Sequence, residues 1–359
     1  MFREGFEGSA FPPVGRRADA FPQDDLLRGR RAAYRRFCGS RWPETVGAPI
    51  CPLRGCVDAY DLTTRRRVKC AACHRRFSVT SGTIFASREL SFADLPGAIC
   101  PIVNASKGLS AVQLSRDLDV RHKTAFVLMH KLREAIAAET RDTRLEGEVE
   151  GDGAAFGGHA RPMNPRERRV DRRLLANRSG KRRVVVVPRQ RGGRTVARAF
   201  LREAEGVEFA RERIALCSIV AADEVAHWDT LEPTFDMRRI NHSEACSRDG
   251  AHTNLAESYF SRLRRMIGGQ HLRVEGRYLD AYAAHAAWLE DHRKESNGRL
   301  ADRLIGGALA APVSRAWEGC WQRRAAGSRL PRSRRTCPCA LPPCARVRGA
   351  WHGAVPGPH

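Results

Sequence analysis

The sequence predicts an α/β protein in which a domain of mixed strands and helices follows two small N-terminal units. Three observations support this fold class. Two pairs of cysteines flank a β-rich stretch within residues 49–80. Two helical patterns joined by a tight link follow within residues 81–140. Strand patterns then fill residues 145–223, and an amphipathic helix begins at about Asn254.

The composition indicates a partner of high negative charge. The 359 residues include 63 Lys and Arg against 40 Asp and Glu, which gives a formal net charge of +23. Such an excess favours nucleic acid, because phosphate neutralisation supplies the sequence-independent part of binding. A generally Arg-rich proteome is the alternative explanation. The length allows two or three domains, and a hydrophobic content of 42% is enough to form their cores.

The sequence also argues against a membrane protein. No apolar run approaches the roughly 18 residues of a membrane span, and the N-terminus lacks the apolar region of a signal peptide. We therefore expect a cytoplasmic protein. In that compartment the 12 cysteines are expected to be thiols or metal ligands rather than disulfides.

Residues 49–80 are interpreted as a zinc ribbon. Tetrahedral Zn²⁺ needs four soft ligands, and each knuckle turn supplies two of them. The four candidate ligands are Cys51, Cys56, Cys70 and Cys73. The first pair departs from the usual spacing, because Arg54 stands where its second cysteine is expected. This departure implies a wider knuckle or a weaker site. Free buried thiols are the alternative, and His74 is a possible substitute ligand.

Residues 81–140 are interpreted as a helix-turn-helix region. One helix ends near Asp119, and the next runs from Arg121 to Ile136. The tight link between them is typical of helix-turn-helix motifs, although a plain helical hairpin has the same pattern. The start of the second helix is where such motifs contact bases and phosphates. The residues there are Arg121, His122, Lys123 and Thr124.

The helix pattern from about Asn254 has one apolar stripe and one polar face. The stripe contains Leu255, Tyr259, Leu263 and Met266, and the polar face contains Asn254, Glu257, Ser261 and Arg264. An ordinary solvated helix face is the alternative interpretation. Two earlier carboxylates favour a functional role for this polar face, because a strand is expected to end at Asp152 and a later strand at Asp223.

The order of strand, hairpin, strand, strand and helix, with carboxylates at these points, is the layout of a ribonuclease H-like fold. Asp152, Asp223 and Glu257 are therefore candidate ligands of two Mg²⁺ or Mn²⁺ ions, about 3.5–4 Å apart in such sites. Two metals held in this way support in-line phosphoryl transfer.

Several motifs, in this order along residues 30–323, carry a family resemblance. They are CHRRFSVTSGTIF, GLSAVQLSRDLDVRHKTAFVLMHKLREA, VEGDGAAFGG, NRSGKRRVVVV, AADEVAHWDTL, INHSE and DGAHTNLAESYFSRLRR. In these motifs the chain resembles bacterial insertion-sequence transposases of the ISXO type, which have an N-terminal zinc ribbon and a DDE domain and are related to Merlin transposons. The resemblance implies metal-dependent cutting and joining of DNA at the ends of the element.

The resemblance also assigns roles to residues. It implies that Asp152 is the first catalytic acid and Asp223 the second. The third position is Glu257 or Asn254, and we favour Glu257 because it is charged. The resemblance further places Arg264 or Arg265 on phosphate and His242 and His252 near the site. Gly153 departs from the acidic residue that often follows the first Asp in this family.

The expected organisation and function follow from these interpretations. The expected parts are an N-terminal segment (1–48), a zinc ribbon (49–80), a helix-turn-helix region (81–140), a ribonuclease H-like DDE transposase domain (145–300), a C-terminal helical part (301–323) and a disordered basic tail (324–359). The expected partners are element-end and target DNA, with a homo-oligomer assembled on that DNA. The alternatives are a non-catalytic DNA-binding regulator, an inactive decayed copy of a transposase, and a zinc-dependent hydrolase.

Overall fold

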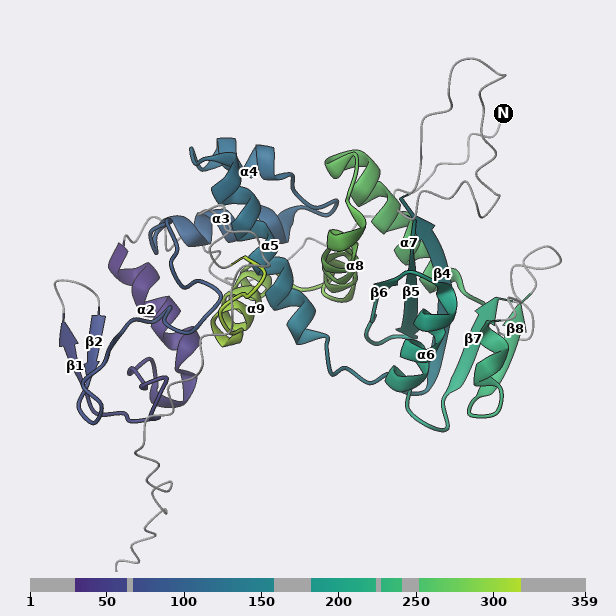
Figure 1. Ribbon diagram of the computed structural model, residues 1–359, viewed down its shortest axis with the longest axis horizontal. Helices are drawn as coiled ribbons and strands as arrows, with labels where there is room; N and C mark the ends of the chain where they lie inside the picture. The colour runs from purple at the N-terminus through teal and green to yellow at the C-terminus, as the bar shows by residue number, and fades with distance from the viewer. Residues whose placement is uncertain (1–29, 63–66, 158–181, 224–226, 241–251, 318–359) are drawn as a thin grey trace, which may run out of the picture. The chain divides into compact units, whose positions relative to one another are not determined.

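The computed structural model describes residues 30–62, 67–157, 182–223, 227–240 and 252–317 (Figure 1). The side chains of Arg30, Asp223 and Ile240 are outside the described part. The expected basic tail and His242 also lie outside it. The helices of the described residues include none that is long and apolar enough to cross a bilayer.

A small antiparallel sheet and a helical core form the first part of the described chain. The sheet has the order β1 (Ala59–Leu62), β2 (Arg67–Cys70) and β3 (Arg76–Phe77). The helices are α2 (Arg30–Arg41), α3 (Asp94–Asn104), α4 (Ala111–Asp117), α5 (His122–Glu139) and, from much later in the chain, α9 (Asn297–Ala310). Their buried apolar side chains form one core that includes Phe37, Leu95, Leu132 and Leu304.

The two helices predicted around a tight link are confirmed as α4 and α5. The first begins at Ala111, because the Ser110 hydroxyl accepts the backbone N–H of Gln113 at 3.1 Å and caps the helix. The link turns sharply at Asp119, whose φ of 49° lies in the left-handed region that Asp tolerates better than most residues. Leu114 and Leu128 face the core, so both helices pack on it.

A five-stranded mixed sheet confirms the predicted α/β class. Its order is β6 (Arg198–Phe200), β5 (Arg183–Gln190), β4 (Glu148–Phe156), β7 (Ile219–Asp223) and β8 (Asp236–Ile240). The predicted hairpin is confirmed, since β5 and β6 are antiparallel, with Gly192 at φ 70° between them. The central strand β4 is antiparallel to β5 and parallel to β7, and β7 is parallel to β8.

One strand end was predicted incorrectly. The sequence predicts a strand that ends at Asp152, but β4 continues to Phe156. Pairing with β7 has its last pair at Gly151–Ala222, whereas pairing with β5 continues to Phe156–Arg183. Asp152 therefore lies inside β4, at the point where one of its two neighbouring strands stops.

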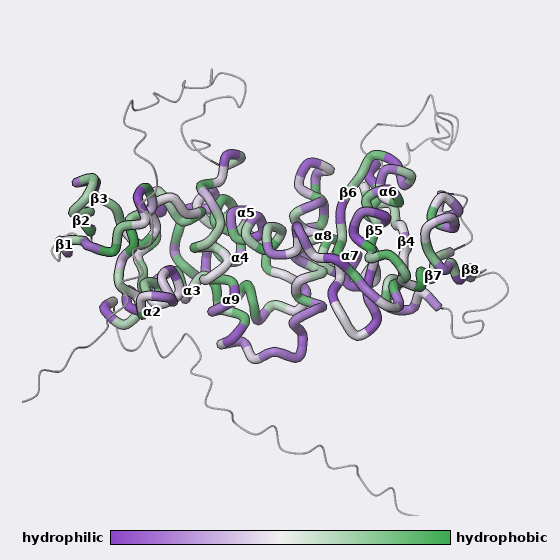
Figure 2. The backbone as a smooth tube through the Cα atoms, turned by 90° about the horizontal axis from the view of Figure 1, so that it is seen from below, coloured by the Kyte–Doolittle hydropathy of each residue, from purple (hydrophilic) through white to green (hydrophobic). Residues whose placement is uncertain are grey.

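Helices cover both faces of this sheet. On one face, α7 (Asn254–Met266) and α8 (Gly276–Asp291) pack on apolar side chains of β4 and β5. On the other face, α6 (Glu203–Arg213) and the short helix η5 (Trp228–Leu231) pack on the alternate residues of the same strands. The valine run of β5 between the two layers stands out as a hydrophobic stretch (Figure 2). Alternate side chains of β4 and β5 therefore pack against α7 on one face and against α6 on the other.

Candidate active site

The backbone register brings two of the predicted catalytic acids to neighbouring positions. The last residue pair between the parallel strands β4 and β7 is Gly151–Ala222. The next residue on each strand is Asp152 on β4 and Asp223 on β7. Residues at equivalent positions of adjacent parallel strands lie side by side, about 5 Å apart. Two acids separated by 70 intervening residues in the sequence thus start from adjacent backbone positions.

Alternation along β4 points Asp152 towards the α7 face. The neighbouring glycines lie on the opposite face, in close contact with α6 and η5. A Cβ added at Gly151 would lie 2.5 Å from Cζ3 of Trp228, and one added at Gly153 would lie 2.5 Å from Oε1 of Glu203. Gly151 is required because the buried Trp228 ring packs directly on the strand, whereas a Cβ at Gly153 would displace only the end of the flexible Glu203 side chain. Gly153, which stands where the family often has an acidic residue, thus lies against the Glu203 side chain in this chain.

The Asp152 carboxylate is half-buried and is oriented by the main chain. Its Oδ1 accepts the backbone N–H of Gly153 at 2.6 Å. A hydrogen bond to a carboxylate favours its charged form and limits its rotation. The Asp152 side chain is thus held in place beside the last residue pair that joins β4 and β7.

The third predicted acid lies on α7, which crosses this face of the sheet. The apolar stripe predicted for this helix is largely confirmed, since Tyr259, Leu263 and Met266 are buried. Asn254 and Glu257 are both exposed in the first turn of the helix. The fold therefore presents an amide and a carboxylate from the same turn, and both stay candidates for the third ligand.

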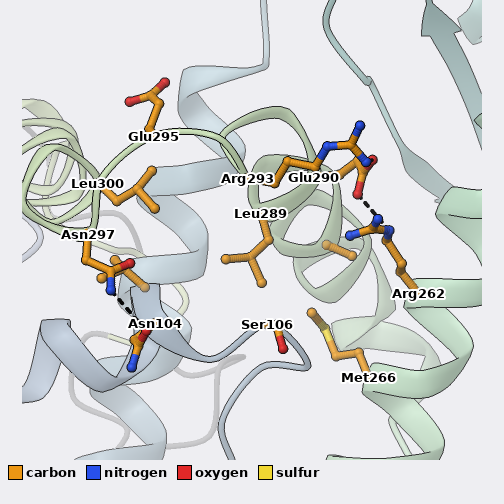
Figure 3. Close-up of a pocket in the computed structure, with 12 residues that line it drawn as sticks. Asn104, Ser106, Arg262, Met266, Leu289, Glu290, Arg293, Glu295, Asn297 and Leu300 are labelled. Atoms are coloured by element: carbon orange, nitrogen blue, oxygen red, sulfur yellow. Dashed lines mark hydrogen bonds and ion pairs between the residues drawn. The ribbon is translucent and has the colours of Figure 1, made fainter. Parts of the chain in front are cut away.

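The body of α7 is attached to α8 by a buried glutamate. The Glu290 side chain is only 1% exposed, and Arg189, Arg262 and Arg293 lie 2.7–2.9 Å from its oxygens. Arg189 also donates to the carbonyl oxygen of Leu255 at 2.8 Å, in the first turn of α7. Figure 3 shows Arg262 and Glu290 facing each other at a pocket of about 170 Å³. No local sequence pattern marks Glu290 as such an attachment point.

Three of the four predicted zinc ligands come together. The sulfur atoms of Cys51, Cys70 and Cys73 all lie within 4.8 Å of one another, and those of Cys51 and Cys73 are 3.7 Å apart. Zn–S bonds of about 2.3 Å at tetrahedral angles imply a spacing of about 3.8 Å. Hydrogen bonds, first from the backbone N–H of Cys73, lower the pKa of Cys70 to about 7. The three thiols thus have the spacing that suits a soft metal ion. The lowered pKa belongs to Cys70, whereas, despite a hydrogen bond from the Arg75 backbone, burial and the neighbouring Cys70 and Cys51 thiols raise the pKa of Cys73.

The fourth cysteine is oriented differently. The Cys56 thiol lies 3.6 Å from the carbonyl oxygen of Asp58, outside the group of three. The turn before it is wide, since the N–H of Gly55 donates to the Cys51 carbonyl and the N–H of Cys51 donates to the Cys56 carbonyl. The two extra residues in the first cysteine pair are thus accommodated as a looser turn.

The predicted DNA-contacting residues fall into two groups. Arg121, His122 and Lys123 are exposed at the start of α5, whereas Thr124 donates to Oε2 of Glu89 at 2.7 Å. Arg264 and Arg265 are exposed at the end of α7, where Arg265 also donates to the Ser261 hydroxyl at 2.8 Å. Five of the six predicted basic and polar contacts are thus available at the surface.

A family model matches part of the chain. Residues 144–291, from just before β4 to the end of α8, match the family model of the ISXO2-like transposase domain. No curated protein matches the chain. Among solved structures, the Mos1 strand transfer complex matches with 14% sequence identity and a TM-score of 0.21, over 62% of this chain and 76% of that chain.

Proposed function

We propose that this chain, whose residues 144–291 match the ISXO2-like transposase domain, cuts and joins DNA at the ends of an insertion sequence. The observation that carries the proposal is the register of β4 and β7, which sets Asp152 beside Asp223 on the sheet within the matched domain. We further propose that this mixed sheet, with α7 across it, is a ribonuclease H-like catalytic fold.

Asp152, Asp223 and one residue of the first turn of α7 would hold two Mg²⁺ or Mn²⁺ ions. Carboxylate and amide oxygens suit these hard cations, which polarise a phosphoryl group and its attacking and leaving oxygens when they are bound. The half-buried Asp152 already has one oxygen fixed by the main chain. On charge grounds Glu257 is the stronger third candidate, and Asn254 is the second.

Separate surfaces would bind the DNA. Arg121, His122 and Lys123 are placed at the start of α5, where a helix-turn-helix contacts DNA. The exposed Arg264 and Arg265 would contact phosphates beside the catalytic face. We propose a structural Zn²⁺ at Cys51, Cys70 and Cys73, with Cys56 as a fourth ligand only after its thiol turns from the Asp58 carbonyl. The complex on two element ends would contain more than one copy of the chain.

The test uses the purified full chain, a DNA duplex with the element end, and Mg²⁺ or Mn²⁺. We expect strand nicking by the natural protein and a loss of at least about 10³-fold in Asp152→Asn and Asp223→Asn, because each removes a metal-ligand charge. End binding without cleavage in any metal would instead support the DNA-binding regulator or an inactive copy. Asn254→Ala and Glu257→Ala, compared side by side, identify the third ligand.

A further inference from the structure

A second acidic residue of β4, Glu150, is completely buried beside the proposed active site. Its side chain is 0% exposed. One oxygen, Oε2, accepts the backbone N–H groups of Leu255 at 2.7 Å and Ala256 at 3.2 Å. The other, Oε1, accepts Nε of Arg191 at 3.0 Å. Nδ1 of His252 lies 3.0 Å from the same oxygen, without the alignment of a hydrogen bond.

These contacts replace the usual cap of a helix. The first N–H groups of a helix have no partner within the helix, and the preceding residue normally supplies one from its side chain. The residue at this position of α7 is Thr253, and its side chain makes no capping hydrogen bond. The acceptor is instead a carboxylate from a strand 105 residues earlier in the chain. A negative charge at this end of α7 also complements the helix dipole.

Arg191 extends the attachment to the segment before the helix. Besides Glu150, its guanidinium binds Glu148 and donates to the carbonyl oxygen of His252 at 3.2 Å. The buried carboxylate thus fixes both the last residues before α7 and its first turn. Asn254 and Glu257 belong to this same turn.

Glu150 and Asp152 are two residues apart on β4, so they lie on the same face of the strand. The strand therefore carries one carboxylate at the proposed metal site and one that fixes the helix providing its third ligand. Because Glu150 is buried and its oxygens are occupied by the helix and by Arg191, it is not itself available to a metal ion.

We propose that Glu150 is a positioning residue for the active site. It acts through the first turn of α7, which it holds at a fixed distance and angle from Asp152. The inference rests on the proposed function, since it concerns the geometry of that same site. Supports of this kind around metal ligands typically contribute about 10–100-fold in metal affinity or activity.

The test compares Glu150→Gln with a control of matched stability loss on the other face of the sheet. Gln keeps the shape of the side chain. Its amide NH2 group, however, must point either to the helix N–H groups or to Arg191, so that two donors then face each other. Val207→Ala is the control, because Val207 is 1% exposed and packs in the core on the α6 side. Glu150→Asp keeps the charge and shortens the reach, and it serves as the second variant if Glu150→Gln does not fold.

Three measurements on the full chain are made for each variant: Mn²⁺ affinity, nicking of end DNA at saturating Mn²⁺, and amide hydrogen exchange at Leu255 and Ala256. For Glu150→Gln we expect about 10–100-fold weaker Mn²⁺ binding or nicking, with faster exchange at the two amides and unchanged DNA binding. Val207→Ala should stay within about threefold of the natural protein in both functions, because α7 keeps its attachment.

Two outcomes separate this inference from the proposed function. If Glu150→Gln and Val207→Ala lose nicking and Mn²⁺ affinity equally, Glu150 is only a structural residue and the inference is overturned. If the natural protein shows protected amides at Leu255 and Ala256 but neither binds Mn²⁺ nor nicks DNA, the proposed function fails, and with it the catalytic meaning of the attachment.

Discussion

Two regions that meet at α8 differ in the partners of their buried polar groups. At α7, the buried carboxylates of Glu150 and Glu290 are surrounded by arginines and helix N–H groups. Between α5 and α8, the buried His130, Arg133 and His285 lack such partners: within the described residues, both ring nitrogens of His285 and Nε of Arg133 have no hydrogen bond. Arg133 instead lies over the Tyr282 ring, 4.0 Å from its centre.

The two kinds of burial have different consequences. A buried charge with oriented partners stays charged, and its strong directional contacts fix the position of an element. A buried histidine without partners loses its charge instead. Burial, with the nearby Arg133 as a second cause, lowers the pKa of His130 to about 3. The first region therefore determines geometry, whereas the second acts mainly as an aromatic and apolar contact between helices.

The largest effect on stability is expected for Glu290→Gln. The substitution leaves the guanidinium of Arg189 buried without a countercharge, so we expect a loss of about 3–5 kcal/mol in the free energy of unfolding. Urea denaturation measures this loss. The control is Glu208→Gln, which breaks an exposed pair with Arg211 and should change stability by less than about 1 kcal/mol. Similar losses in both variants would show that the buried Arg189 does not need Glu290.

A matched pair of arginine substitutions should give an intermediate effect. Arg189→Met removes a charged hydrogen bond to Leu255 and an ion pair to Glu290, and we expect a loss of about 1.5–3 kcal/mol. Arg133→Met removes a buried charge that has no ion pair with any carboxylate of the described residues, and it should be neutral or stabilising. Thermal or urea denaturation of both variants tests the contrast, which is broken if Arg133→Met is the more destabilising of the two.

The smallest effect concerns pH. The unfolded His130 titrates near pH 6.5 and the folded one near 3, so only the unfolded state gains a proton as the pH falls through this range. Stability contributed by the neutral ring is thus complete above pH 6.5 and is lost towards pH 3. We expect His130 to account for a loss of about 1–2 kcal/mol between pH 6.5 and 5.

His130→Phe provides the check, because the ring already lies among aromatic side chains, with Phe126 at 4.5 Å and Trp317 at 4.7 Å between ring centres. The free energy of unfolding should fall less between pH 6.5 and pH 5 in this variant than in the natural protein. An unchanged difference would assign the acid sensitivity to other groups. His271, whose pKa is also lowered by burial to about 4, is the next candidate.

Much of the local structure followed from residue patterns. The spacing of Tyr259, Leu263 and Met266 predicted the buried stripe of α7, and Gly192 marked the turn of the β5–β6 hairpin. The apolar pattern around Asp119 predicted α4, α5 and the tight link between them. These predictions succeeded because periodicity and turn chemistry depend on neighbouring residues.

Other features were not predictable, because they depend on partners far along the chain. Nothing near Glu150 shows that it caps a helix 105 residues later, and nothing near Glu290 shows that three arginines surround it. One signal was present: Glu150 stands two residues before Asp152, on the same face of a strand. The orientation of the Cys56 thiol towards the Asp58 carbonyl, outside the group formed by the other three cysteines, likewise depends on the fold.

Residue types and their short-range order already define the chemistry available to this protein: the acids Asp152, Asp223 and Glu257, the thiols, the positive charge and the α/β class. Long-range packing sets where β4 ends, which cysteines meet, and how α7 is attached to the sheet. Such features result from strand pairing and from the need of buried charges and helix N–H groups for partners, which any part of the folded chain can supply.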